Sequence, residues 1–314
     1  MYIGVDIGGT NLVAGLVNES CQIIERAKTP ANPERSAEVV FQDVVRLCHD
    51  VTAKAGISMK DIKSVGIGAP GSVDAENGIF LFAGNLPFRN TPVVEMLRKY
   101  IDCPIYVGND ANAAALGEVY AGAAKDCNSA LLITLGTGIG GGIIINRKIY
   151  SGFNGGGGEI GHTVIEVDGW SCTCGRNGCW EAYSSATGLI RMTKEAMEAD
   201  KGSLLHEASK ENGKISGRAA FAMARRGDES AKAVVDKYIK YLAAGLANMI
   251  NILQPEMVCI GGGVCNEGDY LLRPLIELTR VEEFKGFDKK AHIRVAELGN
   301  DAGIIGAAML GKGN

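Results

Sequence analysis

Short apolar runs separated by glycine-rich turns occur in two stretches of the chain, about 130 residues apart. Runs of this length that are rich in Val, Ile and Leu and bounded by Gly or Asn predict β-strands. The predicted strands are Tyr2–Val5, Asn11–Val17 and Gln22–Arg26 in the first stretch, and Ala130–Leu135, Gly142–Ile145 and Ile149–Tyr150 in the second. Because both stretches follow the same plan, the pattern predicts two similar α/β domains that face each other across a cleft.

The segments between these strands carry apolar residues three to four positions apart, a period typical of amphipathic helices. The predicted helices are Ser36–Ala55, Ala111–Ala123, Glu229–Leu253 and Ala302–Leu310. Pro255 should end the third helix, because proline has no N–H for the helical hydrogen bond. The apolar run Met257–Ile260 that follows is predicted to be a buried strand.

The composition is that of a globular protein of two domains of about 150 residues each. Of the 314 residues, 46% are hydrophobic and 22% are charged. The net charge is 32 − 36 = −4, so nothing indicates a nucleic-acid or membrane-surface partner. No apolar run approaches the ~20 residues that span a bilayer, and a strand rather than a leader is predicted from residue 2. We therefore expect a cytoplasmic protein whose nine cysteines form no disulfide scaffold.

Glycine is about twice as frequent as usual, with 43 of the 314 residues, or about 14% against about 7%. The excess gathers in short clusters at the ends of apolar runs. We expect these glycines to adopt positive φ or to let the backbone approach a ligand closely.

Three cysteines form a C-x-C-x4-C array, with glycines in the turn between them, and one histidine precedes them closely. Three Cys and one His are the usual ligands of a closed, tetrahedral structural zinc site. The alternative is three reduced, buried cysteines that bind no metal. The clustering favours Zn²⁺ held by His162, Cys172, Cys174 and Cys179.

Two tight glycine turns, Asp6–Thr10 and Gly136–Gly140, follow predicted strands, one in each domain. Such turns expose consecutive backbone N–H groups that bind phosphate oxygens, and threonine hydroxyls add further donors. Hairpins that bind nothing are the alternative. Because a third glycine cluster follows the strand after Pro255, we predict nucleotide binding by Gly8, Gly9, Thr10, Gly136, Thr137, Gly138, Gly261, Gly262 and Gly263.

Two segments, Gly136–Gly141 and Gly66–Gly71, also fit the G-x-G-x-x-G fingerprint of dinucleotide-binding proteins. That fingerprint requires a helix directly after the glycines. The first is followed by the predicted strand at Ile143 and the second contains Pro70, so an NAD-dependent enzyme is disfavoured. The chain also contains no G-x-x-x-x-G-K-[ST] sequence, which excludes a P-loop.

Two aspartates stand where phosphoryl transfer needs carboxylates. Asp6 ends the first strand beside a predicted phosphate site, where Mg²⁺ would relieve the repulsion between the charges; an aspartate bonded to its own turn is the alternative. Asp110 lies between the strand Ile105–Val107 and the next helix, so we predict it to be the general base that receives the hydroxyl proton. An N-cap role is common at such a position and should lower its pKa.

These motifs occur in the order found in the ROK family (repressors, open reading frames and sugar kinases), which the whole chain resembles. Within that family the bacterial ATP-dependent glucokinase branch is most similar. The matching segments are Asp6–Asn11, Asn109–Asn112, Leu135–Gly142, Glu159–His162, Ser171–Glu181 and Ile260–Gly263. The resemblance implies an α/β, two-domain ribonuclease-H-like (actin/hexokinase) fold in which the last helix returns to the N-terminal domain. The expected domains are therefore 1–109 plus 302–314, and 110–301.

The resemblance also implies ATP, Mg²⁺ and structural Zn²⁺ as cofactors, Asn11 beside the nucleotide, and a homodimer or homotetramer. It implies that His162 both binds zinc and touches a sugar hydroxyl. The residues expected to hold the hexose are Asn85, Asn109, Asp110, Glu159, His162 and Glu181.

One departure bears on the choice of sugar. Glucokinases of this branch often carry Trp after the Asn-Leu pair, where this chain has Pro87 and Phe88. A hexose kinase, with glucose as the expected substrate, remains the main hypothesis, and an N-acetylmannosamine or N-acetylglucosamine kinase is the alternative.

The family's repressors carry a helix-turn-helix segment before the first strand; here that strand begins at residue 2, so a repressor is disfavoured. Trp170 and Trp180 are expected to pack rather than to stack on sugar.

Overall fold

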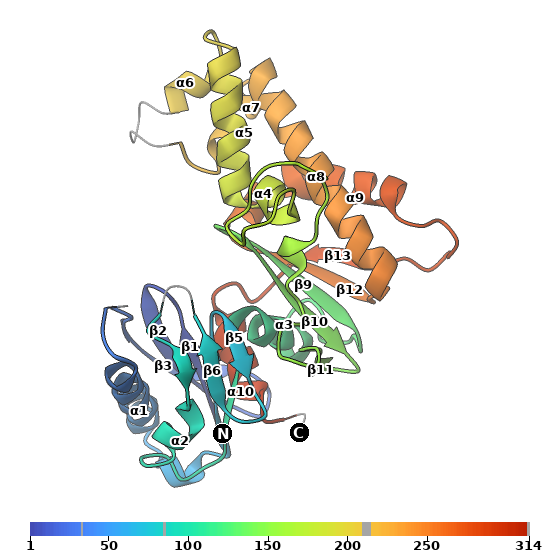
Figure 1. Cartoon of the computed structure of the whole chain (residues 1–314). Coiled ribbons are helices and arrows are strands. Elements are labelled where there is room, and N and C mark those ends of the chain that lie inside the picture. The colour runs from blue at the N-terminus through green and yellow to red at the C-terminus, as the bar shows by residue number, and fades with distance from the viewer. Residues whose placement is uncertain (33, 84–85, 209–214, 313–314) are drawn as a thin grey trace. The chain divides into compact units, whose positions relative to one another are not determined.

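The structure is a computed structural model that describes residues 1–32, 34–83, 86–208 and 215–312. Its first sheet has the strand order β3-β2-β1-β4-β8 (Figure 1). These strands are β1 (Tyr2–Ile7), β2 (Asn11–Val17), β3 (Ile23–Pro30), β4 (Ser64–Ala69) and β8 (Ile105–Asn109). The first three form an antiparallel meander, whereas β4 pairs with β1, and β8 with β4, in parallel. Parallel pairing brings the carboxyl ends of β1, β4 and β8 to one edge, where Asp6 and Asp110 lie.

Helices and a small second sheet complete the core around this first sheet. They are α1 (Ala37–Lys54), α2 (Val93–Leu97), the 3-10 turn η1 (Met59–Asp61), and the antiparallel strands β5 (Ser72–Asp74), β6 (Ile79–Phe82) and β7 (Arg89–Thr91). Phe41, Phe80 and Phe88 stack on one another with ring centroids 5.2–6.4 Å apart. Each of these rings is almost fully buried.

The other five-stranded sheet repeats the topology of the first, in the order β11-β10-β9-β12-β13. Its strands are β9 (Ala130–Leu135), β10 (Ile139–Ile145), β11 (Lys148–Ile149), β12 (Met257–Gly261) and β13 (His292–Val295). Again the second and third strands of the meander pair antiparallel, and the last two strands pair in parallel. The repeat predicted from the apolar pattern is therefore confirmed. One difference is that β10 begins at Ile139 instead of Gly142, so the glycine turn is shorter than expected.

Helices and short turns account for most of the remaining chain between β11 and β13. They are α4 (Trp180–Ser184), α5 (Ala186–Ala199), α6 (Leu205–Ala208), α7 (Ala219–Arg225), α8 (Glu229–Leu253), α9 (Asp269–Glu282), η2 (Ile160–His162) and η3 (Gly263–Glu267). The bounds of α8 are those predicted: Asp228 caps its start, and Gln254 takes a left-handed φ of 44° just before Pro255. In the described part of the chain, no helix is long and apolar enough to cross a membrane.

Two further helices, α3 (Asp110–Ala121) and α10 (Asp301–Met309), pack unusually closely on each other and on the first sheet. A Cβ atom on Gly306 of α10 would lie 1.6 Å from a carbonyl oxygen of α3. Cβ atoms on Gly4 and Gly66 would lie 1.9 and 1.7 Å from carbonyl oxygens of α10. Part of the glycine excess therefore serves contacts between helices and strands, and the expectation that it belongs to loops was incomplete.

The chain divides into two compact units. The first comprises residues 1–132, 142–158 and 296–314, and the second comprises 133–141 and 159–295. The predicted boundaries, at residues 109/110 and 301/302, differ from this division. The close packing of α3 on α10 explains the difference, because it holds α3 in the first unit.

Candidate functional site

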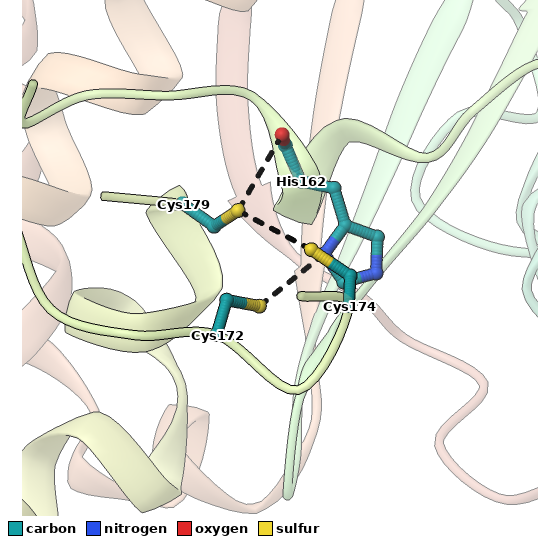
Figure 2. Close-up of side chains that lie close together, drawn as sticks. All are labelled: His162, Cys172, Cys174 and Cys179. Carbon is teal, nitrogen blue, oxygen red and sulfur yellow. Dashed lines mark hydrogen bonds between the residues drawn. The ribbon is translucent and has the colours of Figure 1, made fainter. Parts of the chain in front are cut away.

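Four side chains that can bind a metal ion converge in the second unit, and we call them the metal cluster (Figure 2). They are His162, Cys172, Cys174 and Cys179, whose ligand atoms all lie within 4.8 Å of one another. Cys172 Sγ lies 3.6 Å from His162 Nδ1, and Cys174 Sγ lies 3.6 Å from Cys179 Sγ. A tetrahedral zinc ion with bonds of about 2.0–2.3 Å separates its ligands by about 3.5–3.8 Å. The donor set and these two distances therefore fit Zn²⁺.

The loop that carries the thiols depends on two glycines. Gly175 and Gly178 have φ values of 90° and 76°, in the left-handed region that glycine adopts without strain. A Cβ atom on Gly178 would in addition lie 1.7 Å from the carbonyl oxygen of Glu166. The backbone thus turns back on itself at both positions, which brings the thiol of Cys172 to the imidazole of His162 and the thiol of Cys174 to that of Cys179 (Figure 2).

The thiols of the metal cluster differ in acidity. The backbone N–H of Arg176 lowers the pKa of Cys174, whereas burial, together with hydrogen bonds from the neighbouring thiols, raises the pKa of Cys179 to about 12. A thiol as basic as Cys179 becomes a thiolate at neutral pH only when a cation compensates its charge. Binding of a metal ion to this cluster would therefore have to release the proton of Cys179.

His162 directs Nδ1 toward the thiols, which leaves its other ring nitrogen for a second partner. Nε2 lies 3.9 Å from the carboxylate of Glu159, whose side chain is 67% exposed. The two predicted sugar ligands are therefore adjacent, and His162 can meet a ligand through Nε2 while Nδ1 stays in the metal cluster.

Glu181 connects the metal cluster to the second glycine turn. Its Oε2 accepts the backbone N–H of Ile139 at 2.9 Å, and its Oε1 lies 3.7 Å from Cys172 Sγ. A Cβ atom on Gly138 would lie 2.2 Å from Oε2, so this glycine provides room for the carboxylate. The sequence predicted Glu181 as a sugar ligand but not Ile139 as its donor, because any residue type can supply a backbone N–H.

The first glycine turn uses part of its backbone internally. The N–H of Gly8 donates to Asn11 O at 2.9 Å, and Ala31 N–H donates to Thr10 O at 2.8 Å. The N–H of Gly8 therefore closes the β1–β2 hairpin instead of facing a phosphate, contrary to the expectation of consecutive free donors. Gly9 and Thr10 are exposed and can still meet a ligand.

The second turn is organised in the same way. Gly136 N–H donates to Gly138 O at 3.0 Å, while the hydroxyl of Thr187, on α5, donates to Thr137 O at 2.7 Å. Thr137 itself is exposed. The turn is thus attached to the start of a helix, and the N–H of Gly136 bonds within the turn.

The third predicted glycine cluster follows β12. Gly262 has a φ of 93°, and a Cβ atom on it would lie 2.4 Å from the carbonyl oxygen of Leu135. This glycine therefore allows close approach to β9. Gly263 has no atom within 4 Å of its Cβ position, so it borders open space.

Asp6 and Asp110 form what we call the carboxylate pair of the first unit. Burial, and after it the charge of Asp110, raises the pKa of Asp6 from 3.8 to about 6. Burial also raises the pKa of Asp110, although its carboxylate accepts the N–H of Ala111 at 2.8 Å. Gly303 of α10, which the sequence reasoning did not single out, lies against the carboxyl of Asp6. Two partly buried carboxylates that repel each other favour a bound cation or a proton on one of them.

Asn109, not Asp110, caps helix α3. The Oδ1 of Asn109 accepts the N–H groups of Ala111 and Asn112, at 2.9 and 3.1 Å, and its Nδ2 donates to Gly71 O at 3.1 Å. The expectation that an N-cap position lowers the pKa of Asp110 is therefore wrong. Asp110 lies one residue inside the helix, and its burial outweighs the nearby N–H donors. A raised pKa makes it a better proton acceptor.

The sequence also singled out Asn85, Phe88, Trp170 and Trp180. Asn85 lies outside the described residues. Phe88 is fully buried against Phe41 and Phe80, so its side chain offers no surface to a sugar. Trp180 is also fully buried, as expected for a packing residue, and Trp170 stacks on Tyr183 with ring centroids 4.6 Å apart.

Comparison with known proteins identifies the family. The ROK family model matches residues 2–314. The chain belongs to the ROK family. Its fold is accordingly the two-domain actin/hexokinase-like fold of ROK sugar kinases, as the resemblance implied.

Several ROK proteins are similar to this chain over nearly its whole length. A glucokinase of Halalkalibacterium halodurans is 37% identical, covering 99% of this chain and 94% of that protein. A glucokinase of Thermotoga maritima is 36% identical, covering 99% and 96%. A crystal structure of a ROK family glucokinase from Streptomyces griseus, in complex with glucose and AMPPNP, has a TM-score of 0.79 and 35% identity, and the match covers 100% of this chain and 99% of that one.

Proposed function

We propose that this ROK protein is an ATP-dependent sugar kinase that transfers the γ-phosphoryl group of ATP to glucose, giving glucose 6-phosphate. The observation that carries the proposal is the carboxylate pair, in which burial raises the pKa of a strand-end aspartate, Asp6, and of the aspartate that opens α3, Asp110. Similarity to glucokinases over 99% of the chain supports the same reaction.

Asp110 is the general base in this proposal. Its carboxylate accepts the proton of the sugar 6-hydroxyl while the bond from that oxygen to the γ-phosphorus forms. The bond from the γ-phosphorus to the bridging oxygen breaks, and its electron pair leaves with ADP. Because burial raises the pKa of Asp110, the carboxylate holds this proton more readily than an exposed aspartate would.

Asp6 is the residue that would hold Mg²⁺ beside the nucleotide. A buried carboxylate with a pKa of about 6 suits a divalent cation, because the cation offsets its charge and that of its neighbour. When bound, Mg²⁺ neutralises charge on the phosphate oxygens. The residues proposed to contact the nucleotide are Asp6, Gly8, Gly9, Thr10, Asn11, Gly136, Thr137, Gly138, Gly261, Gly262 and Gly263.

The metal cluster has a structural role in this proposal, with Zn²⁺ held by one imidazole and three thiolates. Zinc would orient His162 so that Nε2 faces the sugar, with Glu159 and Glu181 accepting from neighbouring hydroxyls. Asn85 and Asn109 are the proposed amide contacts to the sugar. The burial of Phe88 removes one objection to glucose, since the departure at that position changes the core and not an exposed surface.

Steady-state ADP release across glucose, mannose, N-acetylglucosamine and N-acetylmannosamine tests the proposal. Glucose should have the highest kcat/KM. An N-acetyl sugar that exceeds glucose tenfold would overturn the choice of substrate and leave the kinase intact. Absence of ADP release with every sugar, from folded and zinc-loaded protein, would reject the kinase itself.

A further inference from the structure

A pocket of about 240 Å³ lies along α3, and every residue that lines it belongs to the first unit. The helix contributes Asn112, Leu116 and Tyr120, which are four residues apart and so share one face. Other walls come from β8, from the end of α10 and from the β10–β11 hairpin. Neither member of the carboxylate pair lines this pocket, and none of the predicted nucleotide-binding residues does.

Asn112 is the polar group that distinguishes this pocket from an apolar packing defect. Its side chain is 5% exposed, and its Oδ1 has no hydrogen-bond partner. A buried carbonyl oxygen without a donor is unfavourable and is rare in folded proteins. The motif Asn109–Asn112 gave roles to its first two residues and none to the fourth. A ligand with an O–H or N–H group would supply the missing donor.

The remaining walls indicate the rest of the ligand. Leu116, Ile149 and Leu310 are apolar, and Tyr106 and Tyr120 present aromatic rings. An apolar body, aromatic or branched, fits such walls.

The charge of the lining is positive. Arg147 and Lys148 line the pocket, and no carboxylate is among its described lining residues. Arg147 is held in place: its guanidinium donates to Val119 O at 2.9 Å and lies over the ring of Tyr120 at 5.4 Å. Lys148 is exposed and forms no ion pair within the described part of the chain, so its ammonium group can meet an anion.

We propose that this pocket binds a small organic anion that combines an aromatic or branched apolar body with one hydrogen-bond donor. The donor bonds Asn112 Oδ1, the body lies against Leu116 and the tyrosine rings, and the anionic end lies beside Lys148. This pocket shares Asn109, a proposed sugar ligand, with the kinase site, but neither carboxylate of the pair and none of the proposed nucleotide-binding residues lines it.

Isothermal titration of the full-length protein with three matched probes tests the proposal. The probes are 3-(4-hydroxyphenyl)propionate, 3-phenylpropionate, which lacks the donor, and tyramine, which keeps the ring and hydroxyl but carries a positive charge. The hydroxy acid should bind about tenfold more tightly than either of the others, because each lacks one of the two polar contacts. Failure of all three to bind at millimolar concentration would overturn the proposal.

Two variants then assign the contacts. Asn112→Leu removes the acceptor at similar volume, so it should abolish the preference for the hydroxyl and raise Tm, because an unpartnered carbonyl is removed. Lys148→Glu should abolish the preference for the anion over tyramine, whereas Lys194→Glu, an exposed lysine in the second unit, should not. Preferences that survive both substitutions would show that the probes bind elsewhere. If Asn112→Leu does not fold, the probe series and Lys148→Glu still decide.

Discussion

The metal cluster and the carboxylate pair are built in opposite ways. The metal cluster comes from one short segment, residues 162–179, in which two glycine turns fold the chain back on itself. Asp6 and Asp110 are about 100 residues apart, and parallel pairing through β4 brings their strands to one edge. One site is therefore local in sequence and the other is assembled by the sheet.

The two sites also differ in what stabilises them. Thiols that lie 3.6 Å from their neighbours form only weak contacts without an ion, so a bound metal should hold the metal cluster of the second unit together. The carboxylate pair is held by strands and by α10 whether or not a cation is present, and it carries an electrostatic cost. Removing zinc should thus disorder the metal cluster. Removing a cation from the carboxylate pair should leave its structure intact and only increase the repulsion between Asp6 and Asp110.

The largest effect should come from removing zinc. We expect about one zinc per chain, and chelation or Cys179→Ala should lower Tm by at least about 10 °C and abolish sugar binding, because metal binding contributes to folding free energy. Elemental analysis and thermal unfolding measure both. Cys103→Ala, a cysteine outside the metal cluster, should keep its zinc. If the protein is fully active without zinc, the metal cluster does not need a metal ion for stability or for sugar binding.

Asp110→Asn should have the next largest effect. The amide keeps the size of the side chain but cannot take the hydroxyl proton, so kcat should fall by at least about 10²-fold while glucose binding persists. Rapid-mixing assays and calorimetry separate the two quantities. Asp102→Asn, an exposed residue just before β8, serves as the control. If kcat stays near the wild-type value, Asp110 is only a residue of the first helical turn.

The carboxylate pair should leave a signature in the pH dependence of stability. Because the pKa of Asp6 is raised from 3.8 to about 6, the folded state binds this proton more tightly, and the free energy of unfolding should fall as pH rises from about 4 to about 6. Above that range the loss is complete, at no more than about 3 kcal/mol.

Asp6→Asn should reduce this fall, leaving the part that the raised pKa of Asp110 contributes, and should stabilise the protein at neutral pH. Urea unfolding between pH 4 and pH 7, with a chelator for Mg²⁺ and without nucleotide, measures the difference from wild type. Asp126→Asn, at an exposed position, should leave the profile parallel to that of wild type. A parallel profile for Asp6→Asn as well would mean that burial does not shift this carboxyl.

The smallest effect should come from the contact between Glu181 and the second glycine turn. A methyl group at Gly138 would meet Oε2 at 2.2 Å, so Gly138→Ala should displace the carboxylate from Ile139 N–H. We expect the KM for glucose to rise about tenfold, the equivalent of one charge-assisted hydrogen bond. Gly136→Ala, whose Cβ has its nearest neighbour at 4.0 Å, should change the KM for ATP more than that for glucose. Equal effects on both substrates from Gly138→Ala would argue against a role of Glu181 in holding the sugar.

Local features of this protein followed from its sequence because local physics decides them. Periodic apolar residues and Pro255 were sufficient to predict the ends of α8, and ligand type and spacing were sufficient to predict the members of the metal cluster. The repeated hairpins were visible for the same reason, since strand and turn preferences act over a few residues.

Only the tertiary structure decided what depends on distant neighbours. The division into two units differs from the predicted boundaries because Gly306 and Gly117 let α3 and α10 approach closely. These two segments lie about 190 residues apart in the sequence. The pKa of Asp110 proved raised and not lowered, because burial by the folded chain outweighs the helix N–H groups. Likewise the N–H of Gly8 closes a hairpin, which no glycine pattern reveals. Burial and hydrogen-bond partners are set by which segments pack together, and a local pattern does not contain that information.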